Sequence, residues 1–297
     1  MRPAVPLALS AVLASIVALG GCGARNAASG PSATSTCTPL PPDGDPTGWK
    51  RDNVSIIKGG CGPSPASNAA FKVTNTGTEP FTYTITFNLL NDSGEVMDNF
   101  RQTVASVRPG RTVKRTVSPG EPLPGPGNED LRIATVRAVP ADEAPVSPGV
   151  CPPAGTRVMA DEGDAAMGLR VVGLHLTNCG TGVYHITGFP HLRLLDDKRK
   201  PVDSVRILHG TDQISTAVTE DARPQAVTLQ PGESASASLA WRNTTGSGSP
   251  VNAPYAEVTA KPGSPTVTVT PEIDLGTTGE LGVSPWKKDQ APVPSKP

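Results

Sequence analysis

Aromatic residues, charge and long apolar runs are all scarce in this sequence. Of 297 residues, 4% are aromatic and 18% are charged, and the formal net charge is −1. Because basic residues are not in excess, electrostatics give no reason to expect a nucleic-acid partner. A strict glycine period and sustained apolar heptads are also missing, which excludes collagen and coiled coils. The chain instead has 31 glycines and 33 prolines between short runs of Val, Leu and Thr, a composition typical of all-β proteins with many turns.

The most apolar segment lies at the N-terminus. Arg2 precedes an uncharged stretch whose core, Leu7 to Leu19, is shorter than the roughly 20 residues that span a membrane. A positive residue followed by a short apolar core is typical of a secretory signal peptide. We therefore expect residues 1–21 to be a signal peptide and the folded part to lie outside the cytoplasm.

A cysteine stands directly after this segment, in the sequence Leu-Gly-Gly-Cys at residues 19–22. The motif resembles the lipobox of bacterial lipoproteins, in which small residues fit the peptidase cleft and the cysteine carries diacylglycerol. It predicts that Cys22 is the lipidated N-terminus and that acyl chains such as palmitate hold the protein on the outer face of the cell membrane. Residues 22–48 are then expected to form a flexible tether. The alternative is an ordinary signal peptide with a chance cysteine, or an uncleaved anchor.

The remaining cysteines are even in number: Cys37, Cys61, Cys151 and Cys179. Export to an oxidising compartment allows them to form disulfides, and four cysteines allow three pairings. Pairing of sequence neighbours, Cys37–Cys61 and Cys151–Cys179, would put one bridge in each half, each stabilising the fold by about 3 kcal/mol. No Cys-x-x-Cys pair is present and the spacings are wide, so the cysteines do not predict a metal site.

The clearest strand signal runs from Phe81 to Leu89, where apolar residues alternate with Thr and Asn. This period of two predicts a strand with one buried apolar face and one solvated, threonine-rich face. Shorter strands are expected on either side, with turns where Asn, Asp, Pro and Gly cluster. The expected strands are 71–74, 104–107, 112–117 and 131–139, and the expected turns are 75–77, 92–94 and 109–110.

The second half repeats this order of strands and turns. Residues 174–181 echo residues 73–78 around an Asn-x-Gly turn, and Gln-Pro-Gly-Glu at 230–233 echoes Arg-Pro-Gly-Arg at 108–111. The repetition predicts two immunoglobulin-like β-sandwich domains in tandem, although chance similarity between such turns is an alternative source of the pattern. The expected boundaries are 49–140 for the first domain, 141–150 for a Pro-rich linker, 151–286 for the second domain and 287–297 for a disordered tail.

Several motifs in the second half are similar to those of a known family. They are Leu-Thr-Asn-Cys-Gly-Thr at 176–181, Thr-Gly-Phe-Pro at 187–190, Pro-Gly-Glu-Ser at 231–234, Leu-Ala-Trp-Arg-Asn at 239–243 and Asp-Leu-Gly-Thr-Thr-Gly at 274–279. Residues 151–286 resemble the DUF4232 family of secreted or lipid-anchored actinobacterial proteins, which has no assigned activity. Phe189 stands where family members often have Tyr. The resemblance implies no catalytic residues.

All four histidines fall in one stretch, which raises the question of a metal or acid–base site. They are His175, His185, His191 and His209. However, His175 and His185 alternate with apolar residues, so we expect them to point away from the core, and we expect all four on separate strands. No His-x-His or His-x-x-x-His pair offers two ligands from one element. We therefore predict no metal site.

Other candidate groups also have structural explanations. Asp196 and Asp197 precede a basic run and predict a charged hairpin turn. The acidic residues 161–164 lack the rest of a calcium loop. Trp241 alternates with Leu239 and is expected in the core, whereas Trp286 is expected to cover a sheet edge near the C-terminal tail.

These observations together favour a lipid-anchored envelope protein with no catalytic residues and no cofactor. We expect its β-sandwich modules to bind a protein or a cell-wall glycan, or to act as spacers, and not to form an enzyme. The alternative is a hydrolase or metal-dependent enzyme whose site is assembled from loops.

Overall fold

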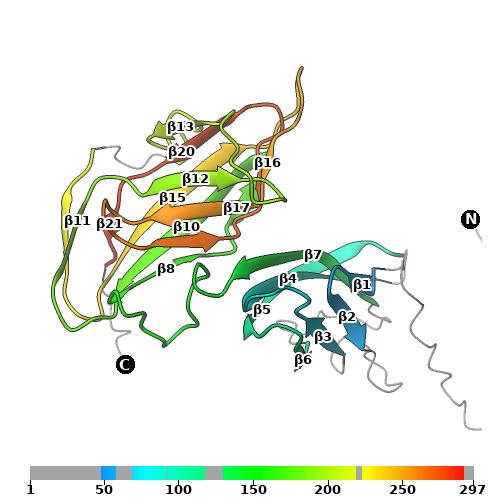
Figure 1. Ribbon diagram of the computed structural model, residues 1–297. Coiled ribbons are helices and arrows are strands. Elements are labelled where there is room, and N and C mark those ends of the chain that lie inside the picture. Colours follow the sequence, from blue (N-terminus) through cyan, green and yellow to red (C-terminus); the bar gives the residue numbers. More distant parts are fainter. Residues whose placement is uncertain (1–47, 58–68, 92, 118–129, 219–222, 291–297) are drawn as a thin grey trace, which may run out of the picture. The chain divides into compact units, whose positions relative to one another are not determined.

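The computed structural model describes residues 48–57, 69–91, 93–117, 130–218 and 223–290. These residues all belong to one compact unit, Thr38–Pro297. Every regular element in the described ranges is a β-strand, so the expected all-β class is confirmed (Figure 1). Among these residues no helix is long and apolar enough to cross a membrane. The signal peptide, Cys22 and the pair Cys37–Cys61 lie outside the described residues.

The first half contains two antiparallel sheets. One sheet has the strand order β1-β2-β3-β6 and the other has the order β5-β4-β7. Their bounds are β1 Lys50–Arg51, β2 Val54–Ile57, β3 Ala70–Thr74, β4 Phe81–Leu90, β5 Val96–Val107, β6 Thr112–Thr116 and β7 Asp130–Pro140. All the strands expected here are present, and β5 is longer than the segment 104–107 that alternation indicated.

Strand β4 buries one face in a core to which both sheets contribute. Tyr83, Ile85 and Phe87 alternate along its buried side, as the period of two predicts. The Phe87 ring lies 5.1 Å from the ring of Phe71 on β3 and 5.6 Å from that of Phe100 on β5, measured between centroids. Because β3 belongs to one sheet and β4 to the other, the contact between Phe71 and Phe87 joins the two layers of a β-sandwich-like fold, whereas Phe100 packs on Phe87 within one sheet.

The opposite face of β4 is less solvated than expected. Thr82 is only 7% exposed, and its Oγ1 accepts a hydrogen bond of 3.2 Å from the backbone N–H of Ser106. Thr82 and Thr84 line a cavity together with residues of the second half. The expectation of a fully solvated face is therefore wrong at Thr82. The alternation of apolar and polar residues along a strand predicts which side chains share a face. It does not predict which distant segment packs over that face.

The second half is built around a larger sheet with the order β13-β20-β15-β10-β8, with β21 paired to β15 and β9 paired to β10. A three-stranded sheet, β12-β17-β18, and the pairs β11–β14 and β16–β19 complete it. The bounds are β8 Thr156–Ala160, β9 Asp164–Ala166, β10 Leu169–Asn178, β11 Tyr184–Thr187, β12 His191–Leu195, β13 Arg206–His209, β14 Ala226–Leu229, β15 Ser234–Arg242, β16 Asn252–Ala253, β17 Tyr255–Thr259, β18 Thr266–Val269, β19 Ile273–Asp274, β20 Glu280–Val283 and β21 Lys287–Lys288.

Two tryptophans lie in the core of the second half. Trp241 is buried, as expected, and its indole Nε1 donates to Asp274 Oδ1 at 2.8 Å. Trp286 is 1% exposed and its indole Nε1 donates to the Ala260 carbonyl at 3.0 Å. Trp286 therefore belongs to the hydrophobic core of this half. Its polar and proline neighbours give no periodic signal, so sequence alone underestimates its burial.

The chain remains ordered beyond Trp286. Lys287–Lys288 form β21, which pairs with β15, and the Asp289 N–H donates to the Ser234 carbonyl at 2.9 Å. The expectation that a disordered tail begins at residue 287 is thus corrected for residues 287–290. Backbone pairing with β15 compensates for a sequence that is polar and charged.

A disulfide joins Cys151 to Cys179, with the two Cα atoms 5.6 Å apart. This is the local pairing that the cysteine spacing suggests for the second half. The bridge ties the start of this half to the residue after β10. The pair expected in the first half, Cys37–Cys61, lies outside the described residues.

The Pro-rich linker packs against its neighbours. Ala144 is buried in a small cluster with Val139, Leu195 and Tyr255. The Glu143 carbonyl also accepts a hydrogen bond of 2.8 Å from the N–H of Thr268 on β18. Residues 141–150 therefore connect the halves through a packed segment and not through an open spacer.

Candidate ligand cavity

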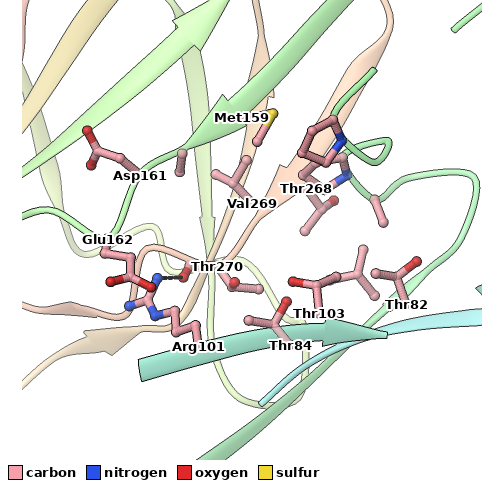
Figure 2. A pocket seen from close by; sticks show the side chains of 15 residues that line it. Thr82, Thr84, Arg101, Thr103, Met159, Asp161, Glu162, Thr268, Val269 and Thr270 are labelled. Atoms are coloured by element: carbon pink, nitrogen blue, oxygen red, sulfur yellow. Dashed lines mark hydrogen bonds between the residues drawn. The ribbon is translucent and has the colours of Figure 1, made fainter. Parts of the chain in front are cut away.

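A cavity of about 500 Å³ opens beside the linker. One wall is the threonine-rich face of β4 and β5, and the other is formed by the end of β8 and by β18 (Figure 2). Val139, Ala144 and Pro145 contribute apolar surface where the linker passes. The volume falls in the range of small-molecule sites in proteins.

Hydroxyl groups are the most numerous polar groups in this lining. Thr84 on β4 and Thr103 on β5 are register partners, so their side chains stand next to each other on one face. Thr270 follows β18 on the facing wall. Within the described residues these three hydroxyls have no hydrogen-bond partner, whereas the Thr268 hydroxyl donates to Glu143 Oε2 at 3.3 Å.

Three charged side chains gather at one end of the cavity, as Figure 2 shows. They are Arg101 from β5 and Asp161 and Glu162, which follow β8. The Arg101 Nη1 atom donates to the Thr270 carbonyl at 3.4 Å, a bond that links the two walls. One cation and two carboxylates make this end polar but leave no excess of positive charge.

Asp161 is held in place by a chain of hydrogen bonds. Its Oδ2 lies 3.1 Å from His175 Nε2, and His175 Nδ1 lies 3.1 Å from Ser236 Oγ. Its Oδ1 accepts from the N–H of Gly173 at 2.8 Å. A Cβ atom at Gly173 would overlap the Asp161 carboxylate, so glycine permits this close approach.

The sequence does not reveal this chain, because its members come from three segments. His175 on β10 faces Ser236 on β15 only through the register of the antiparallel pair. Asp161 follows directly after β8, and its carboxylate reaches His175. The predicted orientation of His175, away from the core, is nevertheless confirmed, because its imidazole meets polar partners on the outer face of the sheet.

The four histidines lie on four different strands, β10 to β13, as expected. His185 Nδ1 lies 3.1 Å from Thr228 Oγ1, and His209 stacks on Phe189 with ring centroids 4.1 Å apart. His191 is exposed. In the part of the chain that the structure describes, no group of three or more His, Cys, Asp or Glu residues is arranged to hold a metal ion.

The predicted charged turn at Asp196 and Asp197 is confirmed. The Asp196 N–H donates to the Lys200 carbonyl, and Asp196 Oδ1 accepts from the N–H groups of Lys198 and Lys200, each at 2.8 Å. The turn also places Asp197 Oδ1 2.9 Å from Arg137 Nη1. The paired carboxylates therefore have different partners and do not face one another as an acid–base pair would.

Arg137 on β7 is the centre of an ion-pair cluster beside the linker. It binds Glu272 through two hydrogen bonds, Nε to Oε1 at 2.6 Å and Nη2 to Oε2 at 2.7 Å, in addition to Asp197. The bond to Glu272 raises the pKa of Arg137 above its ordinary value, so the guanidinium stays charged. Arg199 and Glu143 form a second pair nearby. These contacts fix β7 and the linker against the strands that border the cavity.

The second half is thus a disulfide-bonded, all-β domain with a core that contains two tryptophans. Its sequence matches the family model DUF4232, a domain of unknown function, over residues 151–287. The resemblance seen in the sequence motifs is confirmed. A comparison with curated proteins found none that matches.

Proposed function

We propose that this chain is a lipid-anchored protein of the outer face of the cell membrane, with a binding or structural role. The observation that carries the proposal is the lipobox-like sequence at residues 19–22, which follows a short apolar segment. An acylated Cys22 with two or more chains would anchor the protein stably without a transmembrane helix. The Cys151–Cys179 disulfide supports an oxidising location, because such bonds are rare in the cytosol.

We further propose that the folded part consists of two related immunoglobulin-like domains. The strand pairing supports this: β3 lies between β2 and β6 in the first half, and β10 lies between β8 and β15 in the second. The pairing of Phe81 with Val107 has a counterpart in Tyr184 with Leu229. Insertions between the copies account for the change in sequence offset along the repeat.

The binding role rests on the cavity beside the linker. It combines unpaired hydroxyls, a charged end and apolar walls within one concave surface, which is the usual composition of a ligand site. A protein or a cell-wall glycan is the proposed partner class. No catalytic residue is assigned.

Lipid anchoring is tested by the variant Cys22→Ala, with Ser35→Ala in the tether as the control. The wild-type chain and Ser35→Ala should sediment with membranes and incorporate radiolabelled palmitate. Cys22→Ala should lose the label and appear in the soluble fraction, because no acyl chain can attach. Unchanged membrane retention of Cys22→Ala would refute the anchor.

A hydrolase remains the second candidate, because one specific observation favours it. With a hydrogen on Nε2, His175 donates to Asp161 and accepts the Ser236 hydroxyl proton at Nδ1, which is the geometry of a nucleophile and its base. Against this, Ser236 lies within a strand paired on both sides, with His175 and Lys287. Its backbone is engaged in the sheet and is therefore not available as an oxyanion hole.

A fluorophosphonate probe discriminates the two candidates. A hydrolase would be labelled at Ser236, and labelling would disappear in Ser236→Ala but persist in Ser234→Ala, a control on the same strand and face. The binding role predicts no labelling of the wild-type protein.

A further inference from the structure

We propose that the cavity beside the linker binds an uncharged, hydroxyl-rich ligand of the size of one or two sugar rings. The inference rests on the proposed function, because a lipid anchor on Cys22 would place the cavity among the glycans of the cell surface. It adds the chemical class of the ligand and the residues that recognise it.

The unpaired hydroxyls define the polarity of the ligand. Thr84, Thr103 and Thr270 can each donate and accept a hydrogen bond, as sugar hydroxyls do. A purely apolar ligand would displace water from these groups without replacing its hydrogen bonds, which is unfavourable. The lining therefore selects a ligand that carries many hydroxyl groups.

The charged end excludes anions. Arg101 offers N–H donors beyond the one that reaches the Thr270 carbonyl, but Asp161 and Glu162 border the same end. A phosphate or carboxylate would meet two carboxylates for one guanidinium, so it would be repelled. For a neutral polyol the same three side chains are useful: the planar guanidinium of Arg101 donates hydrogen bonds, and the carboxylates of Asp161 and Glu162 accept them.

Apolar contacts fit the carbon skeleton of such a ligand. Met159, Val139 and Val269 line the cavity, and the threonine methyl groups add to this surface. No aromatic side chain lines the described cavity, so a flat ligand that needs a stacking platform is not favoured. The volume of about 500 Å³ is sufficient for a monosaccharide or a compact disaccharide.

The position of Asp161 is part of the site. The bonds of Asp161 to Gly173 and His175 hold its carboxylate at the cavity wall before any ligand arrives. Such preorganisation reduces the entropy lost on binding. His175 is thus a positioning residue for the cavity.

The test uses the full lipidated chain in a detergent without a sugar headgroup. Calorimetric titrations with cellobiose, trehalose and N,N′-diacetylchitobiose should reveal saturable binding of at least one of them. In the double variant Thr84→Val and Thr103→Val, the dissociation constant should rise about 10-fold or more, because two hydrogen bonds are lost at constant shape. Thr116→Val, an exposed position on β6, is the matched control and should bind like the wild type.

Two further arms sharpen the result. Glucose 6-phosphate should bind more weakly than glucose if the carboxylates exclude anions, and stronger binding of the phosphate would contradict the assigned class. Absence of saturation with every sugar, or a double variant with wild-type affinity, would overturn the site. Fractionation of the same preparations separates this outcome from the proposed function: a chain that keeps its membrane anchor but binds no sugar refutes the cavity assignment alone.

Discussion

The two halves of the molecule share one buried asparagine arrangement. In the first half, Asn75 Nδ2 donates to the carbonyls of Glu79 and Val107, both at 2.7 Å, and its Oδ1 accepts from the Gly77 N–H at 2.8 Å. Its own backbone N–H donates to the Arg111 carbonyl at 2.9 Å. Asn75 therefore joins the end of β3 to the end of β5, in the other sheet.

The second half repeats each of these contacts. Asn178 Nδ2 donates to Gly182 at 2.8 Å and to Leu229 at 2.9 Å, and Oδ1 accepts from Gly180 at 3.2 Å. Its backbone N–H donates to the Glu233 carbonyl at 2.9 Å. The Asn-x-Gly and Pro-Gly sequences that repeat along the chain are thus the two sides of one structural corner. The two halves thus share the same hydrogen bonds between residues that are far apart in sequence, such as Asn75 to Val107 and Asn178 to Leu229. This similarity is more specific than a shared turn composition.

The halves differ in the strand that follows this corner. In the first half β4 is continuous and pairs with both β5 and β7. In the second half the corresponding run is divided into β11, which pairs with β14, and β12, which pairs with β17. Gly188, with φ +96°, and Pro190, which has no N–H to donate, lie between them. The Gly188 carbonyl accepts a hydrogen bond of 3.0 Å from the backbone N–H of Trp286. The interrupted strand therefore binds the segment that carries Trp286.

The largest effect is expected at Trp286, which has no counterpart among the described residues of the first half. Trp286→Ala should lower the free energy of unfolding by about 3 to 5 kcal/mol, because a buried aromatic side chain and its hydrogen bond are lost. Denaturant titration measures the change. Met167→Ala, at a fully accessible position, is the control and should change stability by less than about 0.5 kcal/mol. A small effect would mean that Trp286 contributes little to the stability of the hydrophobic core of the second half.

The disulfide gives the next comparison between the halves. Replacing Cys151 and Cys179 together by Ser should cost about 2 to 4 kcal/mol, because the unfolded chain gains conformational freedom. The same double replacement at Cys37 and Cys61 should give a similar loss if each half has its own bridge. Thiol titration of the oxidised wild-type protein is an independent check, since free thiols would contradict the pairing of all four cysteines.

The asparagine corners should respond equally to mutation. Asn75→Ala and Asn178→Ala each leave buried carbonyls without donors, so each should cost about 1 to 3 kcal/mol in the free energy of unfolding. Asn75→Asp should cost more than Asn75→Ala, because a carboxylate would face two carbonyl oxygens. Asn99→Ala, on the exposed side of β5, serves as the control. Clearly unequal losses of unfolding free energy in Asn75→Ala and Asn178→Ala would show that the two asparagines have the same hydrogen-bond geometry but do not contribute equally to stability.

Sequence reasoning identified the local features of both halves and missed most of the contacts between distant segments. The alternation in β4 and the Asn-x-Gly turns depend on neighbouring residues, so they are readable from one segment. The bonds of Arg137 to Glu272 and of Asp161 to His175 depend on register and tertiary packing, which no local pattern encodes. The cavity was missed for the same reason: its threonines signalled a solvated strand face, and the wall that covers them comes from β8 and β18.

The smallest effect concerns two buried tyrosines, Tyr83 in the first half and Tyr255 in the second. Burial raises the pKa of both phenols, and for Tyr255 the positive charge of Arg137 opposes part of the shift. A raised folded-state pKa means that the unfolded chain releases its phenolic protons first, so stability is fully present below pH 10 and is lost as pH rises through the folded-state values. Tyr83→Phe and Tyr255→Phe should therefore each lose less stability than the wild type as the pH rises above about 10, as measured by denaturant titration at several pH values. Tyr184→Phe, at a half-buried position, is the reference, and a wild-type pH dependence in both test variants would contradict the assignment of alkaline destabilisation to these phenols.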